Sequence, residues 1–220
     1  LKDEVEYFTL SAGLTNCTGT AWFDDFEVVY EDSTSFMDYL APLLTASNKE
    51  KEEDIPIIIP QPYKESYGEE KFFLSKPAIF IDGNHKYEQI KKEIYVLLKD
   101  SFQCDPSSIY SEKEMVDYET VILIGEENSS IIRKYLKKLD INVNWTEIGS
   151  QGYLLAAKKS GNKNLIIISG NTPQGIYYGV QTLKQYPVKK DNGFQMTEGL
   201  ILDRPDYLWR GVVPGSTGLS

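Results

Sequence analysis

The most constraining feature of this sequence is a series of short apolar runs separated by turns and by segments with helical spacing. Runs of this length and composition are typical of strands. Strands interleaved with hairpin turns and helices predict an α+β fold, in which a mixed, mostly antiparallel sheet has helices packed on one face. The runs lie at residues 55–60, 71–74, 78–81, 120–125, 153–157, 165–168 and 197–202.

Three segments between these runs place their apolar residues on one helical stripe. They cover about residues 87–98, 132–139 and 171–183. The third begins with Asn-Thr-Pro, which supplies a capping side chain and a proline in the first turn. In that helix Gly175 and Gly179 lie four residues apart, so we expect this face to approach the sheet closely.

Composition divides the chain into four parts. Residues 1–30 read as a β-hairpin, and because two strands alone are marginal in water, we interpret them as the remnant of a larger sheet. Residues 31–54 end in a charge run without hydrophobic period, which is typical of a linker. Residues 55–206 form the α/β domain, and residues 207–220 follow it. The chain begins without an initiator Met, so we expect it to start within a longer protein.

Charge and length exclude two classes of partner. Lys and Arg number 23 against 33 Asp and Glu, which gives a formal net charge of −10. This balance argues against nucleic acid, whose phosphates require a clustered cationic face. No apolar run approaches the ~18–20 residues that cross a bilayer, so no membrane span is predicted.

The residues that usually carry metal or nucleophilic chemistry are scarce. The chain has one histidine, His85, and two cysteines, Cys17 and Cys104, too few for a structural zinc site. The Gly170–Gly175 segment lacks the phosphate-binding and dinucleotide patterns, and helix capping explains it better. Glu126 and Glu127 precede a helix, where negative charge is favourable. We therefore predict no metal, no cofactor and, from spacing alone, no catalytic residue.

Aromatic residues leave one alternative open. The chain has 15 tyrosines together with Trp22, Trp145 and Trp209. Exposed aromatic rings stack on sugar faces, but tyrosine equally lines the boundary between core and solvent. A sugar-binding platform remains an alternative at this stage.

Four segments carry a resemblance to a known family: 59–62, 73–78, 122–125 and, most specifically, the long run 168–183. Together they resemble the small α/β domain that precedes the catalytic barrel in β-N-acetylhexosaminidases of glycoside hydrolase family 20. A similar domain precedes the barrel in the N-acetylglucosaminidases and hyaluronidases of family 84. The likeness covers about residues 55–213.

The resemblance has consequences for the ends of the chain. Residues 203–213 are similar to the passage into the first barrel strand, so residues 207–220 are the expected start of a catalytic barrel that is missing here. The arginine of the family 20 Arg-Gly opening binds sugar hydroxyls, which implies substrate binding by Arg210. Residues 19–28 look like the last strand of a jelly-roll carbohydrate-binding module.

From this we expect a non-catalytic accessory segment of a glycoside hydrolase that acts on N-acetylated amino sugars. Its partner is then the missing catalytic barrel of the same polypeptide, and the parent is a secreted or cell-surface, multi-domain bacterial enzyme. An exposed apolar patch should mark the barrel interface. The alternatives are an autonomous carbohydrate- or protein-binding module, and an enzyme with a site inside the α/β domain itself.

Overall fold

The computed structural model describes residues 54–83 and 87–206, all within one compact unit, Lys51–Leu208. The predicted N-terminal hairpin, most of the linker and the start of the barrel lie outside the described residues. The division of the chain into four parts therefore stays a prediction.

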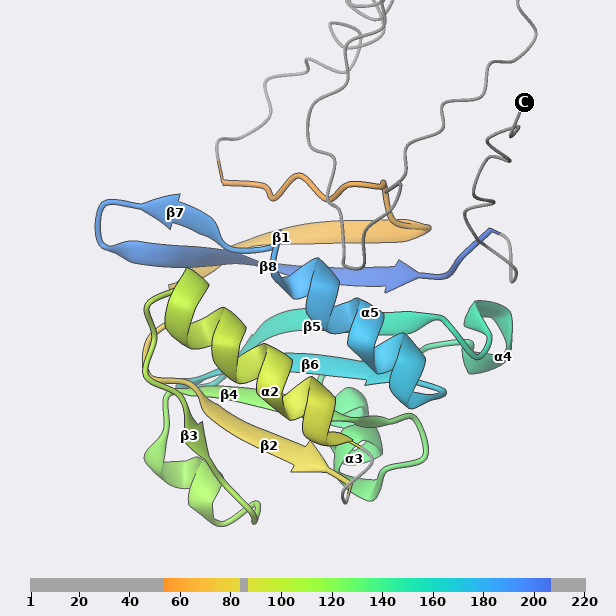
Figure 1. Cartoon of the computed structure of the whole chain (residues 1–220), viewed down its shortest axis with the longest axis horizontal. Helices are drawn as coiled ribbons and strands as arrows, with labels where there is room; N and C mark the ends of the chain where they lie inside the picture. The colour runs from red at the N-terminus through yellow and green to blue at the C-terminus, as the bar shows by residue number, and fades with distance from the viewer. Residues whose placement is uncertain (1–53, 84–86, 207–220) are drawn as a thin grey trace, which may run out of the picture. The chain divides into compact units, whose positions relative to one another are not determined.

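In the described part of the chain, eight strands form one mixed sheet in the order β1-β8-β5-β6-β4-β2-β3, and β7 pairs with β8 (Figure 1). The pairs on the β1 side are antiparallel, and those of β2 with β3, β2 with β4 and β4 with β6 are parallel. The predicted α+β class and mixed, mostly antiparallel sheet are confirmed. The strands are β1 (Lys64–Phe73), β2 (Ala78–Asp82), β3 (Ser107–Ser108), β4 (Thr120–Glu126), β5 (Tyr153–Ser160), β6 (Lys163–Gly170), β7 (Val188–Lys190) and β8 (Gly193–Asp203).

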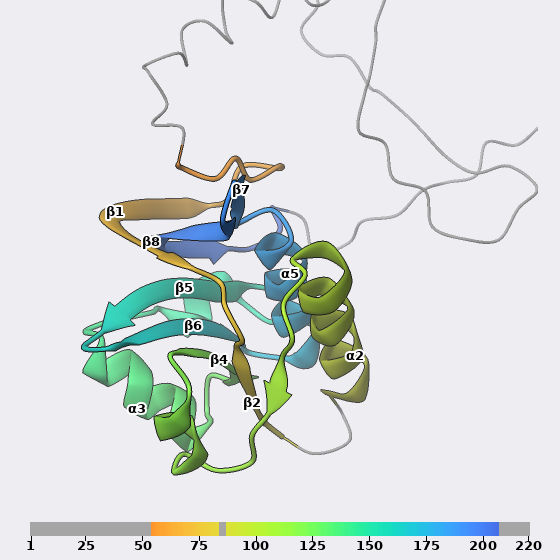
Figure 2. The same ribbon diagram turned by 90° about the vertical axis from the view of Figure 1, so that its left-hand side faces the viewer.

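Helices cover both faces of this sheet, so the prediction that they pack on one face was wrong. Figure 2 shows α2 and α5 on one side and α3 on the other. A π-helical turn, Leu97–Ser101, continues α2, and a 3-10 turn, Glu114–Asp117, precedes β4. The helices are α2 (Glu88–Val96), α3 (Ser130–Lys138), the short α4 (Trp145–Ile148) and α5 (Pro173–Leu183).

The central strands explain why both faces are covered. Residues 121–124 of β4 are completely buried, although adjacent side chains of a strand point to opposite faces. Ile122 and Ile124 belong to the core beneath α2 and α5, whereas Val121 and Leu123 belong to the core beneath α3. A strand that is apolar at every position needs cover on both sides, and α3 provides it on the second side.

The first apolar run does not form the predicted strand. Residues 55–60 contain no strand, and the Ile59–Pro60 peptide bond is cis. Ile58 reaches the core, while Ile57 and Ile59 are exposed. The strand β1 instead starts at Lys64, and most of its side chains are exposed. β1 is an edge strand with a mainly polar sequence, so only its end, in the apolar run 71–74, is predicted as a strand.

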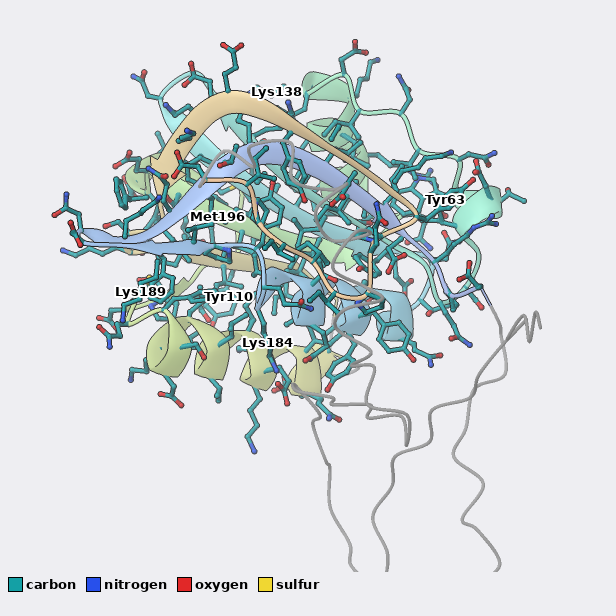
Figure 3. All side chains as sticks on the ribbon, turned by 90° about the horizontal axis from the view of Figure 1, so that it is seen from above. Tyr63, Tyr110, Lys138, Lys184, Lys189 and Met196 are labelled. Atoms are coloured by element: carbon teal, nitrogen blue, oxygen red, sulfur yellow. The ribbon has the colours of Figure 1, made fainter. Side chains whose placement is uncertain are left out.

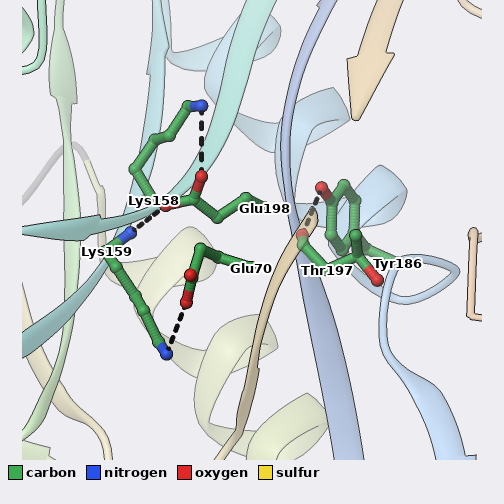
Figure 4. Close-up of polar contacts among 6 residues, drawn as sticks. All are labelled: Glu70, Lys158, Lys159, Tyr186, Thr197 and Glu198. Carbon is green, nitrogen blue, oxygen red and sulfur yellow. Dashed lines mark hydrogen bonds and ion pairs between the residues drawn. The ribbon is translucent and has the colours of Figure 1, made fainter. Parts of the chain in front are cut away.

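Side-chain contacts tie β1, β5 and β8 together (Figure 4). Glu198 of β8 accepts hydrogen bonds from Lys159 N at 2.6 Å and from Lys158 Nζ at 3.4 Å. Lys159 Nζ also pairs with Glu70 of β1 at 2.9 Å. The fully buried Tyr186 donates its hydroxyl hydrogen to the Thr197 carbonyl at 2.9 Å, and burial raises the pKa of that hydroxyl.

The two glycines of α5 allow the close approach that the sequence predicts. A Cβ on Gly175 would lie 2.3 Å from the backbone oxygen of Gly152, and one on Gly179 would lie 2.6 Å from Ile168 Cγ2. Atoms this close cannot coexist without movement of the backbone or of the core. The backbone of α5 therefore contacts its neighbours directly.

We expect Gly175→Ala to lower the free energy of unfolding by about 1–3 kcal/mol, because overpacking at a rigid backbone contact costs this much. The free-energy cost of this clash must exceed the ~1 kcal/mol by which alanine otherwise stabilises a helix relative to glycine. Urea unfolding followed by circular dichroism measures the change. Gln174→Ala, on the exposed side of the same turn, is the control and should stay within about 0.5 kcal/mol. A stabilised Gly175→Ala protein would contradict the close contact.

Candidate functional site

The outer face of α5 differs from every other helix surface in the described part of the chain. The 11 residues of α5 include no charged side chain, although a quarter of the chain is charged. The nine residues of α2 and the nine of α3 carry four charges each. The least buried side chains of α5 include Gln174, which is exposed, and Tyr177, Tyr178 and Gln181, which are half-buried. Tyrosine in place of lysine and glutamate is typical of protein interfaces.

The aromatic side chains of this face are held in place. The rings of Tyr177 and Tyr178 meet edge to face, with centroids 6.3 Å apart. Gln174 Nε2 donates to the Tyr178 hydroxyl at 2.8 Å, and both rings pack against the core. Side chains that are already ordered lose less entropy when a partner binds.

Two exposed isoleucines extend this surface beyond the end of α5. Ile57 and Ile59 are 60% and 71% exposed. The side chain of Gln185 clamps the backbone of Ile59, with Ile59 N donating to Oε1 at 3.0 Å and Nε2 donating to Ile59 O at 3.1 Å. We call Ile57, Ile59, Gln174, Tyr177, Tyr178 and Gln181 the α5 face. Ile57 and Ile59 are its exposed apolar members, and exposed apolar side chains that gather in a patch mark interaction sites.

A polar cluster surrounds the point where β8 leaves the sheet. Tyr63 donates its hydroxyl hydrogen to Glu147 Oε1 at 2.6 Å, and Lys64 Nζ donates to the same oxygen at 3.1 Å. Arg204 donates to the Glu147 carbonyl at 3.0 Å and lies 4.3 Å from the centroid of the Tyr63 ring. Tyr63 N also donates to Asp203 Oδ1 at 3.1 Å. We call these residues the exit cluster; Figure 3 labels Tyr63 at the α4 end of the sheet.

A buried tyrosine connects the exit cluster with α5. The Tyr153 hydroxyl donates to Asp203 Oδ2 at 3.1 Å and is also hydrogen-bonded to the Thr182 hydroxyl of α5. Burial raises the pKa of the Tyr153 hydroxyl, so it keeps its proton at neutral pH. The last residues of β8 are thereby fixed relative to α5.

Acidic side chains at the carboxyl ends of the parallel strands are engaged in local structure. Asp82 accepts a hydrogen bond from the Ser129 hydroxyl, which caps α3 by accepting from Ile132 N at 3.2 Å. Glu127 pairs with Arg133 at 2.9 Å. Crevices at such strand ends often bind ligands. Here, however, Asp82 and Glu127 form their bonds with residues at the start of α3. In the residues that the structure describes, no cluster of three or more His, Cys, Asp or Glu side chains is arranged to hold a metal ion.

The Gly170–Gly175 segment caps a helix, as the sequence indicates. Thr172 accepts from Gly175 N at 3.4 Å. Asn171 Nδ2 donates to the carbonyls of Trp145 at 2.7 Å and Gly149 at 2.8 Å. The loop side chains thus join α5 to α4.

Several residues that the sequence singles out fall elsewhere. Arg210, His85 and Cys17 lie outside the described residues, so substrate binding by Arg210 stays a prediction. Cys104 is buried, donates to the Leu74 carbonyl at 3.2 Å, and has a thiol pKa raised by burial. In the described ranges, none of the helices has both the length and the apolar character that a membrane span requires.

Sequence reasoning missed the α5 face and the exit cluster for different reasons. The α5 face had a signal, because residues 173–183 form a charge-free helix in a highly charged chain. The exit cluster had none. Its members come from separate segments, and Tyr63 and Glu147 lie 84 residues apart in the sequence.

The exit cluster should make folding stability depend on pH. The hydrogen bonds from Tyr63 and Lys64 hold the pKa of the Glu147 carboxyl below its ordinary value. A carboxyl with a lowered folded-state pKa stabilises the protein above its unfolded pKa, and this contribution is lost as pH falls through the folded pKa. We therefore expect wild type to melt higher than Glu147→Gln at pH 7, with the gap closing below about pH 4.5.

Thermal melts from pH 3 to 7 measure this gap. Glu119→Gln, which neutralises an exposed carboxylate elsewhere, is the control and should not change the wild-type profile. A gap between wild type and Glu147→Gln that stays constant down to pH 3 would show that the charge of Glu147 is unimportant.

Comparison with known proteins adds to this geometry. Residues 55–204 match the model of a family described as glycosyl hydrolase family 20, domain 2. The solved structure of CpGH84D is 24% identical with a TM-score of 0.56, over 72% of this chain and 25% of that chain. CpGH84B is 24% identical with a TM-score of 0.52, over 74% and 25%. A Flavobacterium johnsoniae chitobiase is 18% identical with a TM-score of 0.48, over 74% and 23%. This chain spans about a quarter of the length of these proteins.

Proposed function

The chain belongs, over residues 55–204, to the family of glycosyl hydrolase family 20, domain 2, and on this premise we propose how it works. It is a non-catalytic accessory domain that supports the catalytic domain of a β-N-acetylhexosaminidase-type glycoside hydrolase. The parent acts on N-acetylated amino sugars and is a secreted or cell-surface, multi-domain bacterial enzyme.

The α5 face is the observation that carries this proposal. Its tyrosines, glutamines and isoleucines form an ordered, uncharged surface on a protein whose other helices are densely charged. A surface of this composition suits a permanent neighbour in the same polypeptide better than a soluble ligand. We assign the catalytic domain as that neighbour.

The exit cluster supports the same assignment. Arg204, Tyr63 and Glu147 hold the final residues of β8 where the chain leaves the sheet. Tyr153 links this point to α5 through Asp203 and Thr182. A rigid exit next to a docking face fixes the direction in which the following domain starts. Arg210, six residues after Arg204, then contributes to sugar binding in that domain.

The two other hypotheses receive less support. Family membership supports a domain of a larger enzyme over an autonomous binding module. A catalytic site inside the domain would require acidic side chains that are free to act. Asp82 and Glu127, at the strand ends, are instead bonded to Ser129 and Arg133.

We expect this chain alone not to hydrolyse an aryl N-acetyl-β-glucosaminide above the uncatalysed rate. The measurement is release of the aryl alcohol over several hours at high protein concentration, with the parent enzyme as a positive control. Turnover that survives repurification of the chain would place a catalytic site inside it and sink the proposal.

We also expect Tyr177→Glu to uncouple the two domains of the parent enzyme. A carboxylate buried at the interface without a partner costs several kcal/mol, so the parent should unfold in two separate calorimetric transitions and lose solubility. In the isolated chain, where position 177 stays in contact with water, the melting temperature should change by only a few degrees.

Tyr110→Glu is the matched control, because Tyr110 is 77% exposed and follows β3, at the opposite edge of the sheet from β1. It should leave the melting of both the chain and the parent unchanged. An equal effect of Tyr177→Glu on the isolated chain and on the parent would mean that Tyr177 stabilises only its own domain.

A further inference from the structure

A second surface feature lies on the other side of the sheet from the α5 face. Between the end of α3 and the start of α4 is a hollow of about 440 Å³. Leu136, Ile141, Val143 and Trp145 provide its apolar lining. Figure 3 labels Lys138 of α3 and Lys184, which follows α5, on opposite sides of the sheet. Helix α3, which forms one wall of the hollow, and α5 therefore lie on opposite sides of the sheet.

The walls of the hollow are built by local structure. Asp140 adopts a left-handed conformation with φ of 54° just after α3, and Ile141 N closes the turn by donating to Leu136 O at 2.9 Å. On the far side, Asn171 holds the Trp145 carbonyl at 2.7 Å. The hollow is thus formed before any ligand enters, which lowers the entropy cost of binding.

The polar side chains of the hollow are Arg133, Lys137, Asp140 and Asn142. The hollow therefore holds two cations and one carboxylate, before Glu127, which pairs with Arg133, is counted. The guanidinium of Arg133 is bound by Glu127 at 2.9 Å. In the part of the chain that the structure describes, no carboxylate lies within 4.0 Å of Lys137 Nζ, although neighbouring Lys134 has such a partner, Glu112, at 2.6 Å.

We propose that this hollow, which lies between Arg133 of α3 and Trp145 of α4, binds a sugar unit that carries a carboxylate. The Trp145 ring packs against the apolar face of the pyranose. The Lys137 ammonium pairs with the sugar carboxylate. The Asn142 amide and the Asp140 carboxylate form hydrogen bonds with the sugar hydroxyls. The amide can donate or accept, and the carboxylate accepts.

The choice of a saccharide as the ligand rests on the proposed function, because the parent enzyme acts on carbohydrate. The hollow then serves as a secondary subsite that keeps an acidic glycan near the catalytic domain. The cations on the outer side of α3, Lys134, Lys137 and Lys138, add long-range attraction for such a chain.

The test is a titration of this chain, labelled with ¹⁵N, with a hyaluronan tetrasaccharide, which carries glucuronate carboxylates. The control probe is the same tetrasaccharide with its carboxylates converted to methyl esters. We expect saturable shifts of the Trp145 indole and of the amides of Lys137 and Asn142. The methyl ester should bind about tenfold more weakly, and added salt should weaken the acid form. Equal affinity for both forms, or no saturable shift with either, would overturn the proposal.

Two lysine variants separate a specific site from general attraction. Lys137→Gln should weaken the acid form about tenfold, because it removes a charge-assisted hydrogen bond. Lys138→Gln removes the same charge one residue away, from a side chain 5.7 Å above the Tyr135 ring, and should leave the affinity within about twofold. If both variants reduce binding equally, only diffuse charge is involved and the site does not exist.

Trp145→Phe provides a third test and should weaken both probes severalfold, since a smaller ring covers less of the sugar. Spectra of each variant before titration check that it is folded. These results are independent of the α5 face. If the saccharide does not bind but Tyr177→Glu still uncouples the two domains of the parent enzyme, only the subsite is overturned. If the saccharide binds but Tyr177→Glu does not uncouple the two domains, only the accessory role is overturned.

Discussion

The continuous apolar character of the central strands governs the rest of this structure. In β4 every residue from Val121 to Ile124 is buried, and alternate side chains enter two different cores. If either face of such a strand were open to water, several isoleucine and leucine side chains would be exposed. Their exposure costs about 25 cal/mol of folding free energy for each Å² of apolar surface. The helices therefore divide between the two faces, α2 and α5 on one and α3 on the other.

This division gives the domain two surfaces of different chemistry. Gly175 and Gly179 bring the backbone of α5 directly against its neighbours in the core. The tyrosines and glutamines of α5 lie on its outer side. The core beneath α3 is closed by Ile132 and Leu136, and the outer side of α3 is cationic. An uncharged face suits a fixed protein neighbour, while a cationic face beside a tryptophan suits a mobile anionic ligand.

The position of β8 connects these surfaces to the continuing chain. It pairs with β1, β5 and β7, so its path is fixed along its whole length. At its end, Asp203 receives hydrogen bonds from Tyr63 N and from the Tyr153 hydroxyl. The end of β8 is therefore anchored both to the segment before β1 and, through Tyr153 and Thr182, to α5.

Much of the architecture was determined by the sequence alone, because apolar periodicity, capping residues and turn glycines act over a few neighbouring residues. They predicted the β5–β6 hairpin around Gly161, the buried strand β4, and a cap for α5 from Asn171 or Thr172, of which the structure uses Thr172. Of the edge strand β1, only the end that falls in the apolar run 71–74 was predicted, since the polar residues before it carry no strand pattern. The tertiary structure alone decided which face each helix covers and which distant residues meet, as Tyr63 meets Asp203 across 140 residues. Such contacts depend on how the elements pack around two cores, and no local pattern in the chain records that arrangement.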